Sequence, residues 1–129
     1  MASKTVSVSI SHRGKTAVFD ALIDSGNLLS DPISGDGIII IKHTKLNDIY
    51  SVDQLDAIKS LDVLSEKFPT GIRLISSGDG LIPIFRPKSV MVKPLRKNSK
   101  KDISVLIGID FSKGSFGGAE GLIPAQYVE

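Results

Sequence analysis

The residues of this sequence best suited to chemistry are Asp24, Ser25 and Gly26, which directly follow the apolar run 17–23. A carboxylate at the end of a buried strand lies where water is scarce, and there it can take up or donate a proton. Gly26 allows the backbone angles of a tight turn, and the Ser25 hydroxyl can hydrogen-bond locally to hold the turn's shape. The same tripeptide also fits a plain strand-ending turn, so its interpretation depends on the rest of the chain.

Composition excludes several classes of site. The 129 residues are enough for one domain, and 41% of them are apolar, as in an ordinary folded protein. With no cysteine, and with only His12 and His43 far apart in sequence, a zinc site or a disulfide framework is not expected. The chain has no Trp and seven aromatic residues in all, which is a poor supply for stacking single-stranded nucleic acid. No stretch approaches the roughly 18 apolar residues of a membrane span, and residues 1–4 do not resemble a signal peptide, so we expect a soluble chain.

Hydrophobic patterning predicts a mainly β fold with one helical insertion. Residues 5–11 alternate strictly between apolar and polar side chains, and with 16–23 they should form a hairpin that leads into Asp24. Ile38 to Ile41 are four consecutive isoleucines, which indicates a strand buried on both faces. Further strands are predicted at 72–75, 81–85, 89–95, 102–109 and 122–128.

The period changes to that of a helix after Ser51. Ser51 and Gln54 fit a capping box, and apolar residues then recur at helical spacing. We predict a helix, or two short ones, over about 52–67, ended by Pro69 and Gly71. Its apolar stripe should contact the core; the members are Val52, Leu55, Ile58, Leu61 and Leu64.

A glycine-rich turn separates the next two predicted strands. Residues 76–80 read Ser-Ser-Gly-Asp-Gly, a tip with few side chains to anchor it. Pro83 cannot donate a backbone hydrogen bond, so part of this hairpin should lie at a sheet margin.

Positive charge is concentrated between Arg86 and Lys101, where there are seven basic residues and no acid although the net charge of the chain is only +2. This stretch fits a solvated hairpin with its tip at 97–100, or a contact with acidic substrate, anionic lipid or nucleic acid. Nucleic acid is the least favoured of these, because aromatic residues do not alternate with the basic ones.

Three blocks in this order resemble the sporulation sigma-factor-processing aspartic peptidases, a retropepsin-like group. The blocks are Asp24 to Gly35, Ser77 to Pro87 and Val105 to Ile109, and the resemblance spans about residues 6–128. It implies one retropepsin-like half-barrel domain over 1–129, with the 52–67 helix as an insertion that viral retropepsins lack. The competing interpretation is a non-catalytic β-barrel interaction module in which Asp24 is only a turn residue.

The resemblance implies hydrolysis by two carboxylates that share one proton, with no cofactor. One carboxylate activates water and the other donates to the substrate carbonyl. The chain supplies the motif once, so a homodimer with both Asp24 side chains on its two-fold axis is the economical solution. A second aspartate from the same chain would have to be Asp31 or Asp110, and neither lies in such a turn. Asp31 precedes Pro32, where it could form a turn or contact substrate.

The other blocks receive roles from the same resemblance. Ser25 would brace the loop across the dimer axis, and Gly26 would offer backbone to an extended substrate. Residues 75–84 would form a flap, with Ser77, Gly78, Asp79 and Gly80 at its tip. Leu106-Ile107-Gly108 would pack beneath the active-site loop.

Members of this group carry a membrane domain before the peptidase domain, so the resemblance implies action at the cytoplasmic face of a bacterial sporulation membrane. The implied partners are a second copy of the chain, an inactive sigma-factor precursor as substrate and an activating protein, with no direct nucleic-acid partner. Without the membrane domain we expect the dimer to be weak.

Overall fold

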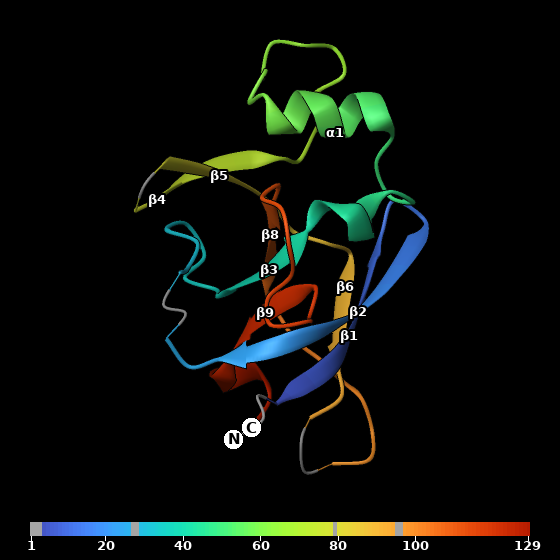
Figure 1. The fold of residues 1–129 in the computed structure, drawn as a ribbon, viewed down its shortest axis with the longest axis vertical. Helices are drawn as coiled ribbons and strands as arrows, with labels where there is room; N and C mark the ends of the chain where they lie inside the picture. Colours follow the sequence, from blue (N-terminus) through green and yellow to red (C-terminus); the bar gives the residue numbers. More distant parts are fainter. Residues whose placement is uncertain (1–3, 27–28, 79, 95–96) are drawn as a thin grey trace.

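The structure is a computed structural model, and it describes residues 4–26, 29–78, 80–94 and 97–129. Strands of these residues form one sheet in the order β4-β5-β8-β3-β9-β2-β1-β6-β7, and α1 lies at the end of the molecule away from the two chain termini (Figure 1). The elements are β1 Thr5–His12, β2 Lys15–Asp24, β3 Ile38–Lys42, η1 His43–Leu46, α1 Val52–Lys59, β4 Arg73–Ser77, β5 Gly80–Phe85, β6 Ser89–Val92, β7 Lys101–Asp102, β8 Leu106–Asp110, β9 Gly121–Pro124 and η2 Ala125–Tyr127. The predicted mainly β class is confirmed.

The sheet combines local hairpins with two long-range parallel pairs. β1 and β2 pair antiparallel from Thr5 with Leu22 to His12 with Lys15, as the alternation predicted. β3 pairs parallel with β8, and β2 pairs parallel with β9. Because parallel neighbours need distant segments of the chain, the middle of the sheet is made only when its last strand is in place.

Apolar side chains gather in two clusters. The larger one lies between β1, β2, β3, β8 and the η1–α1 segment, and it includes Phe19, Tyr50 and Phe85. The smaller cluster lies under the β4–β5 hairpin and consists of Ile38, Ile75, Ile84 and Leu106, with Leu29, Ile40 and Ile82 packed against it. The isoleucine run of β3 therefore contributes to both clusters, which is why the strand has few polar positions.

The predicted helix over 52–67 is wrong in its extent. The capping box is present, since the Gln54 N–H donates to Ser51 Oγ at 3.1 Å and the Ser51 N–H donates to Gln54 Oε1 at 2.9 Å. The helix nevertheless ends at Lys59, because Leu61 takes a left-handed backbone with φ of 56°. Val52 and Leu64 are 74% and 94% exposed, so they do not contact the core.

Three predicted strands have different boundaries. The strand predicted at 89–95 ends at Val92, and Leu95 lies outside the described residues. The stretch 102–109 is divided into β7 and β8, and the one predicted at 122–128 becomes a short strand followed by the turn η2. Apolar residues continue past the ends of β7 and β9, whereas β6 is followed by Lys93 and Pro94.

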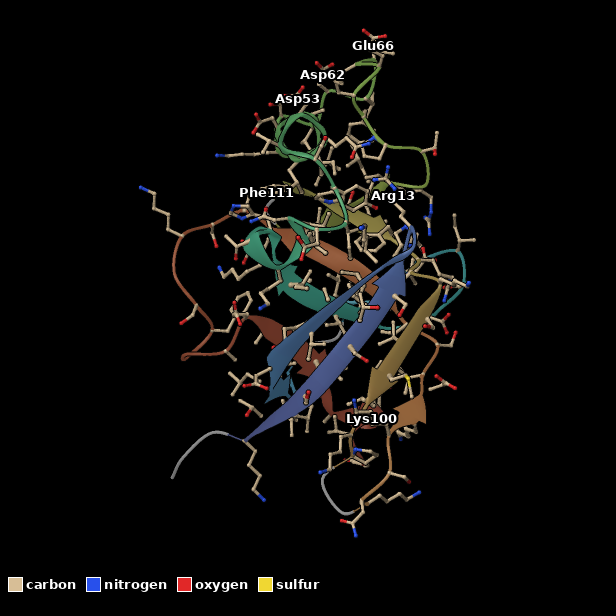
Figure 2. All side chains as sticks on the ribbon, turned by 90° about the vertical axis from the view of Figure 1, so that its right-hand side faces the viewer. Arg13, Asp53, Asp62, Glu66, Lys100 and Phe111 are labelled. Atoms are coloured by element: carbon tan, nitrogen blue, oxygen red, sulfur yellow. The ribbon has the colours of Figure 1, made fainter. Side chains whose placement is uncertain are left out.

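All side chains of the described residues are drawn in Figure 2. Arg13 extends from the β1–β2 turn and lies 4.8 Å from the centre of the Tyr50 ring. Its guanidinium also donates to the Ile49 carbonyl and to Gln54 Oε1, both at 3.2 Å. The first hairpin is thereby attached to the start of α1.

Candidate active site

Asp24 is the last residue of β2 and lies half-buried beside β9. It pairs with Pro124 of β9 in the parallel register. Its Oδ1 accepts a hydrogen bond from the Gly26 N–H at 3.0 Å, which closes a turn around Ser25. Ser25 and Gly26 are exposed, while Asn27 and Leu28 lie outside the described residues. The strand and the turn therefore fix the carboxylate without covering the backbone next to it.

The loop that follows this turn is held by Asp31, which is 1% exposed. The Asp31 carboxylate accepts from the N–H groups of Ile33 and Ser34 and, at 2.9 Å, from Ser34 Oγ. The Arg73 guanidinium donates to Asp31 Oδ2 at 2.9 Å. That bond is the main reason why the pKa of Asp31 is far below its ordinary value; burial opposes the shift, and the Ser34 bonds add to it. Of the two roles considered for Asp31, the geometry is that of a turn-forming residue.

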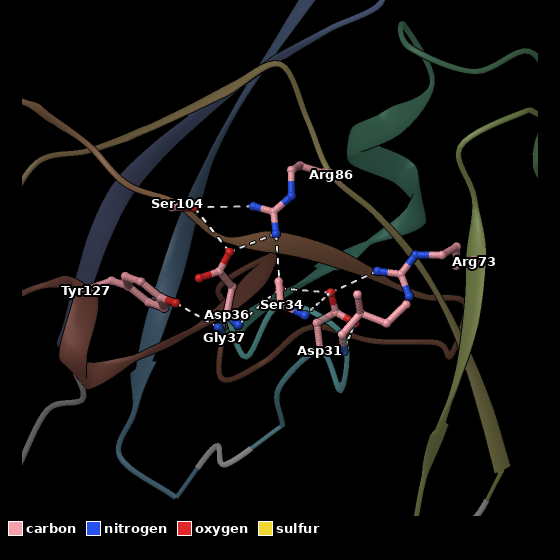
Figure 3. A network of polar contacts seen from close by, with 9 residues as sticks. Asp31, Ser34, Asp36, Gly37, Arg73, Arg86, Ser104 and Tyr127 are labelled. Carbon is pink, nitrogen blue, oxygen red and sulfur yellow. Dashed lines mark hydrogen bonds and ion pairs between the residues drawn. The ribbon is translucent and has the colours of Figure 1, made fainter.

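A second ion pair joins the same loop to the other strand of the hairpin, again at its open end (Figure 3). Arg86, the residue after β5, donates to Asp36 Oδ2 at 2.8 Å and to Ser34 Oγ at 3.2 Å. Ser104 Oγ donates to Asp36 at 3.2 Å, and the Gly37 N–H donates to the Tyr127 hydroxyl at 2.8 Å. The hydrogen bond from Arg86 is the largest cause of a lowered Asp36 pKa, which burial opposes. Both strands of the β4–β5 hairpin are thus tied, at its open end, to the loop that follows the Asp24 turn.

A cleft of about 710 Å³ adjoins the Asp24 turn. Gly26 and Leu29 line it on the side of the turn, Ser77 and residues 80–83 line it from the hairpin, and residues 109–111 line it from the end of β8. Gly78 at the hairpin tip has φ of +44°, while Asp79 lies outside the described residues. The predicted flap segment and the predicted catalytic turn therefore border the same space, although Asp24 itself is not among the residues that line it.

The cleft opens where two strands separate. β5 pairs with β8 only through Ile84 with Gly108 and Phe85 with Ile107. Beyond these pairs, residues 80–83 of β5 pair only with β4. At the last pair before the strands separate, Gly108 leaves room for the side chains of Ile40 and Ile82. A Cβ at Gly108 would lie 2.9 Å from Ile40 Cδ1 and 3.1 Å from Ile82 Cδ1. Pro83 pairs with β4 but not with β8, which agrees with its predicted place at a sheet margin.

One comparison with known proteins identifies the family. The family model described as sporulation factor SpoIIGA, a peptidase family, matches residues 1–118. The chain belongs to this family. It is therefore a sporulation peptidase, as the resemblance had predicted. Neither the curated proteins nor the solved structures gave a match to the chain.

Asp110, the other aspartate weighed as a second carboxylate in this peptidase, lines the cleft but is engaged in an ion pair. Lys42 Nζ lies 3.1 Å from Asp110 Oδ2, and Lys42 is 6% exposed. Burial would raise the pKa of Asp110, but hydrogen bonds from Ser112 and the neighbouring Lys42 charge outweigh it and leave the pKa below its ordinary value. Asp31 and Asp110 thus each neutralise a cation.

Leu106, Ile107 and Gly108 lie in β8, between β3 and β5. Leu106 belongs to the small cluster against which Leu29 packs, whereas Ile107 belongs to the larger cluster. Leu29, which follows the Asp24 turn, therefore packs against the cluster that contains Leu106.

The sequence patterns did not indicate the ion pairs that Lys42, Arg73 and Arg86 form around the site. Arg73 and Asp31 are separated by 42 residues, and Lys42 and Asp110 by 68. A buried lysine at the end of an isoleucine strand could have indicated an ion pair, but the partner follows only from the parallel register of β3 and β8.

Two members of the basic stretch 86–101 bind to groups within the chain. Arg86 is engaged with Asp36, and Lys101 donates to the Glu129 carbonyl at 3.3 Å. Residues 97–100, before β7, lie at the end of the molecule that holds the chain termini, away from α1 (Figure 1). Arg96 lies outside the described residues.

Two kinds of feature are absent from the part of the chain that the structure describes. Within ranges 4–26, 29–78, 80–94 and 97–129, no three His, Cys, Asp or Glu side chains gather as metal ligands would. No helix in the same ranges has the length and apolar character needed to cross a membrane.

Proposed function

We propose that this peptidase is an aspartic endopeptidase that works as a homodimer, with one Asp24 from each chain. The observation that carries the proposal is the turn that holds Asp24: its Gly26 donates to the Asp24 carboxylate and also lines a cleft bordered by the glycine-rich hairpin. Within a family of sporulation peptidases, this turn offers a carboxylate next to a space for substrate.

Two such carboxylates supply the chemistry of peptide hydrolysis. At close range two like charges cannot both ionise, so one side chain stays protonated while the other is charged. The charged carboxylate takes a proton from the attacking water, and the protonated one donates to the carbonyl oxygen of the scissile bond. Asp31 and Asp110 are both bound to cations in the same chain, so a second Asp24 is the simplest source of the second carboxylate.

The cleft supports binding of an extended peptide. Residues 80–83 of β5 have an edge that does not pair with β8, and a substrate strand can pair with such an edge. Ser77, Gly78, Asp79 and Gly80 would be the tip of a flap that closes over the peptide, while Ser25 would brace the two turns against each other. Closure would exclude water from the carboxylates.

The substrate proposed for this site is an inactive sigma-factor precursor, cut near its N-terminus. The support is the family, which is that of a sporulation factor and peptidase. The site would then act at the cytoplasmic face of a sporulation membrane, with an activating protein as a further partner.

The decisive experiment is Asp24→Asn. The asparagine side chain keeps an oxygen that can accept from the Gly26 N–H, so the turn and the fold should be retained. Without an ionisable group, cleavage of the precursor should fall about a hundredfold or more, the range for loss of general acid–base catalysis. Cleavage is measured by mass spectrometry, and folding by circular dichroism.

Asp20→Asn is a matched control, because Asp20 is an exposed residue of the same strand. This variant should cleave like the unmodified chain. If Asp24→Asn also cleaved at the normal rate while folded, the aspartic mechanism would be wrong and Asp24 would be a turn residue only.

A further inference from the structure

The end of α1 has a leucine where a glycine would be easier to accommodate. The Asp62 N–H donates to the Ala57 carbonyl and the Leu61 N–H donates to the Ile58 carbonyl, both at 3.0 Å. This pair of bonds ends a helix with one left-handed residue, which is usually glycine because a Cβ is strained there. Here that residue is Leu61, with φ of 56°. A glycine could end the helix with the same two hydrogen bonds and without the backbone strain. We therefore looked for a function of the Leu61 side chain in its surroundings.

The Leu61 side chain borders the cleft that also adjoins the Asp24 turn. Ile58, Lys59 and Leu61 line it from the end of α1, and Gly26 lines it from the turn. Leu61 is 36% exposed, which is high for a leucine that packs in a core. The left-handed backbone therefore holds an accessible apolar side chain at a wall of the cleft.

The part of the cleft lined by the β4–β5 hairpin has exposed apolar side chains and a strand edge. Leu81 of β5 is 53% exposed, and it lines the cleft together with Ile82 and Phe111. Residues 80–83 have no pairs with β8, so their outer edge can take an extended peptide whose side chains alternate between its two faces. A peptide on this edge would present one apolar side chain between Leu81 and the end of α1.

We propose that Leu61 is a specificity-determining residue, which with Leu81 forms a subsite for an apolar side chain of the extended substrate. The inference rests on the proposed peptidase site, because the subsite and Gly26 share one cleft. The occupant is a large aliphatic or aromatic residue of the substrate, since Leu61 and Leu81 are both apolar and accessible. The helix insertion then contributes to substrate choice as well as to the fold.

The test combines enzyme and substrate variants. A panel of peptides carries the N-terminal region of the sigma-factor precursor, with each large apolar residue replaced in turn by Ala. In the unmodified chain, one of these replacements should lower kcat/KM about tenfold, as expected for an apolar pocket left unfilled. In Leu61→Gly, KM for the parent peptide should rise about tenfold, with kcat within twofold. The Ala-replaced peptide that was cleaved less well by the unmodified chain should then have the same kcat/KM as the parent peptide.

Stability separates this role from a structural one. A glycine at this position relieves the left-handed strain, so the melting temperature of Leu61→Gly should be unchanged or higher. Leu61→Asn, whose side chain also tolerates this backbone, should show the same rise in KM. Leu64→Gly is the matched control, because Leu64 is 94% exposed and does not line the cleft. Its KM should match that of the unmodified chain.

Binding can be measured without cleavage. On an Asp24→Asn background, anisotropy of the labelled parent peptide should show a Kd about tenfold higher for Leu61→Gly. A normal Kd and KM in both Leu61 variants, or an equal loss for every peptide of the panel, would overturn the subsite. Normal cleavage by Asp24→Asn would overturn the catalytic proposal instead, so the two failures are distinguishable.

Discussion

Replacing Asp110 by Asn tests whether one chain supplies one catalytic carboxylate or two. Asp110 lines the cleft, and its Oδ2 lies 3.1 Å from the ammonium of Lys42. Lys42 also donates to Ser112 Oγ at 3.0 Å and to the Ser112 carbonyl at 3.3 Å, and it lies 4.4 Å from the centre of the Phe116 ring. We expect Asp110→Asn to weaken the fold while leaving the chemistry intact.

The expected loss of stability follows from the burial of the pair. Removal of one partner from a fully buried ion pair costs roughly 3–5 kcal/mol, because the other charge stays buried and unpaired. Here the Asp110 side chain is 21% exposed, and the two Ser112 contacts remain for Lys42. The cost should therefore be lower, at about 2 kcal/mol in the free energy of unfolding. With an m-value of about 1.5–2 kcal/mol per molar urea, the midpoint should fall by about 1 M.

The assay is urea unfolding followed by circular dichroism, with precursor cleavage measured in the absence of urea. Asp20→Asn is again the control for the loss of one carboxylate. We expect kcat of Asp110→Asn to stay within about threefold of normal, far from the loss that removal of a general acid or base produces. An unchanged midpoint would refute the energetic argument for the pair. A kcat lowered a hundredfold in a folded variant would refute the one-aspartate site and make Asp110 the second carboxylate.

The remaining predictions concern the dimer and the loop after the Asp24 turn. When folded Asp24→Ala chains replace half of the unmodified chains at constant total concentration, cleavage should fall to about a quarter, because a working dimer needs two intact copies; a fall to one half would contradict this. Since the Arg73 bond lowers the pKa of Asp31 in the folded chain, its stabilisation should be complete above the ordinary pKa of 3.8 and be lost as the pH falls toward the folded pKa. Urea midpoints should therefore show Asp31→Asn less stable than the unmodified chain at pH 7 and closer to it at pH 2.5, and a gap independent of pH would contradict the assignment.

Local patterns predicted the local parts of the fold. Strict alternation in β1 and the isoleucines of β3 defined strands whose burial agrees with the pattern, and the Ser51 capping box marked the start of α1. The end of the helix was missed because helical spacing continues through Leu61 and Leu64. No rule of spacing anticipates a leucine in left-handed backbone, since the hydrogen bonds of the helix end determine that conformation.

The candidate site also has a local part that could be predicted and a long-range part that could not. The Asp24 turn and the glycine-rich hairpin were recognisable because each depends on adjacent residues. Their common border with one cleft, and the Arg73–Asp31 and Lys42–Asp110 pairs around it, depend on parallel and crossover contacts between segments far apart in sequence. Such contacts follow from topology, which a single sequence specifies only weakly.

The parallel pairing of Asp24 with Pro124 makes the order of synthesis matter. The strand beside the Asp24 turn is translated about 100 residues after the turn itself, and Tyr127, whose hydroxyl accepts a hydrogen bond from the Gly37 N–H, comes later still. A growing chain therefore contains the Asp-Ser-Gly motif long before it contains the strand that fixes it. On the proposed mechanism, the Asp24 site is therefore completed only when the last strand of the domain has been made.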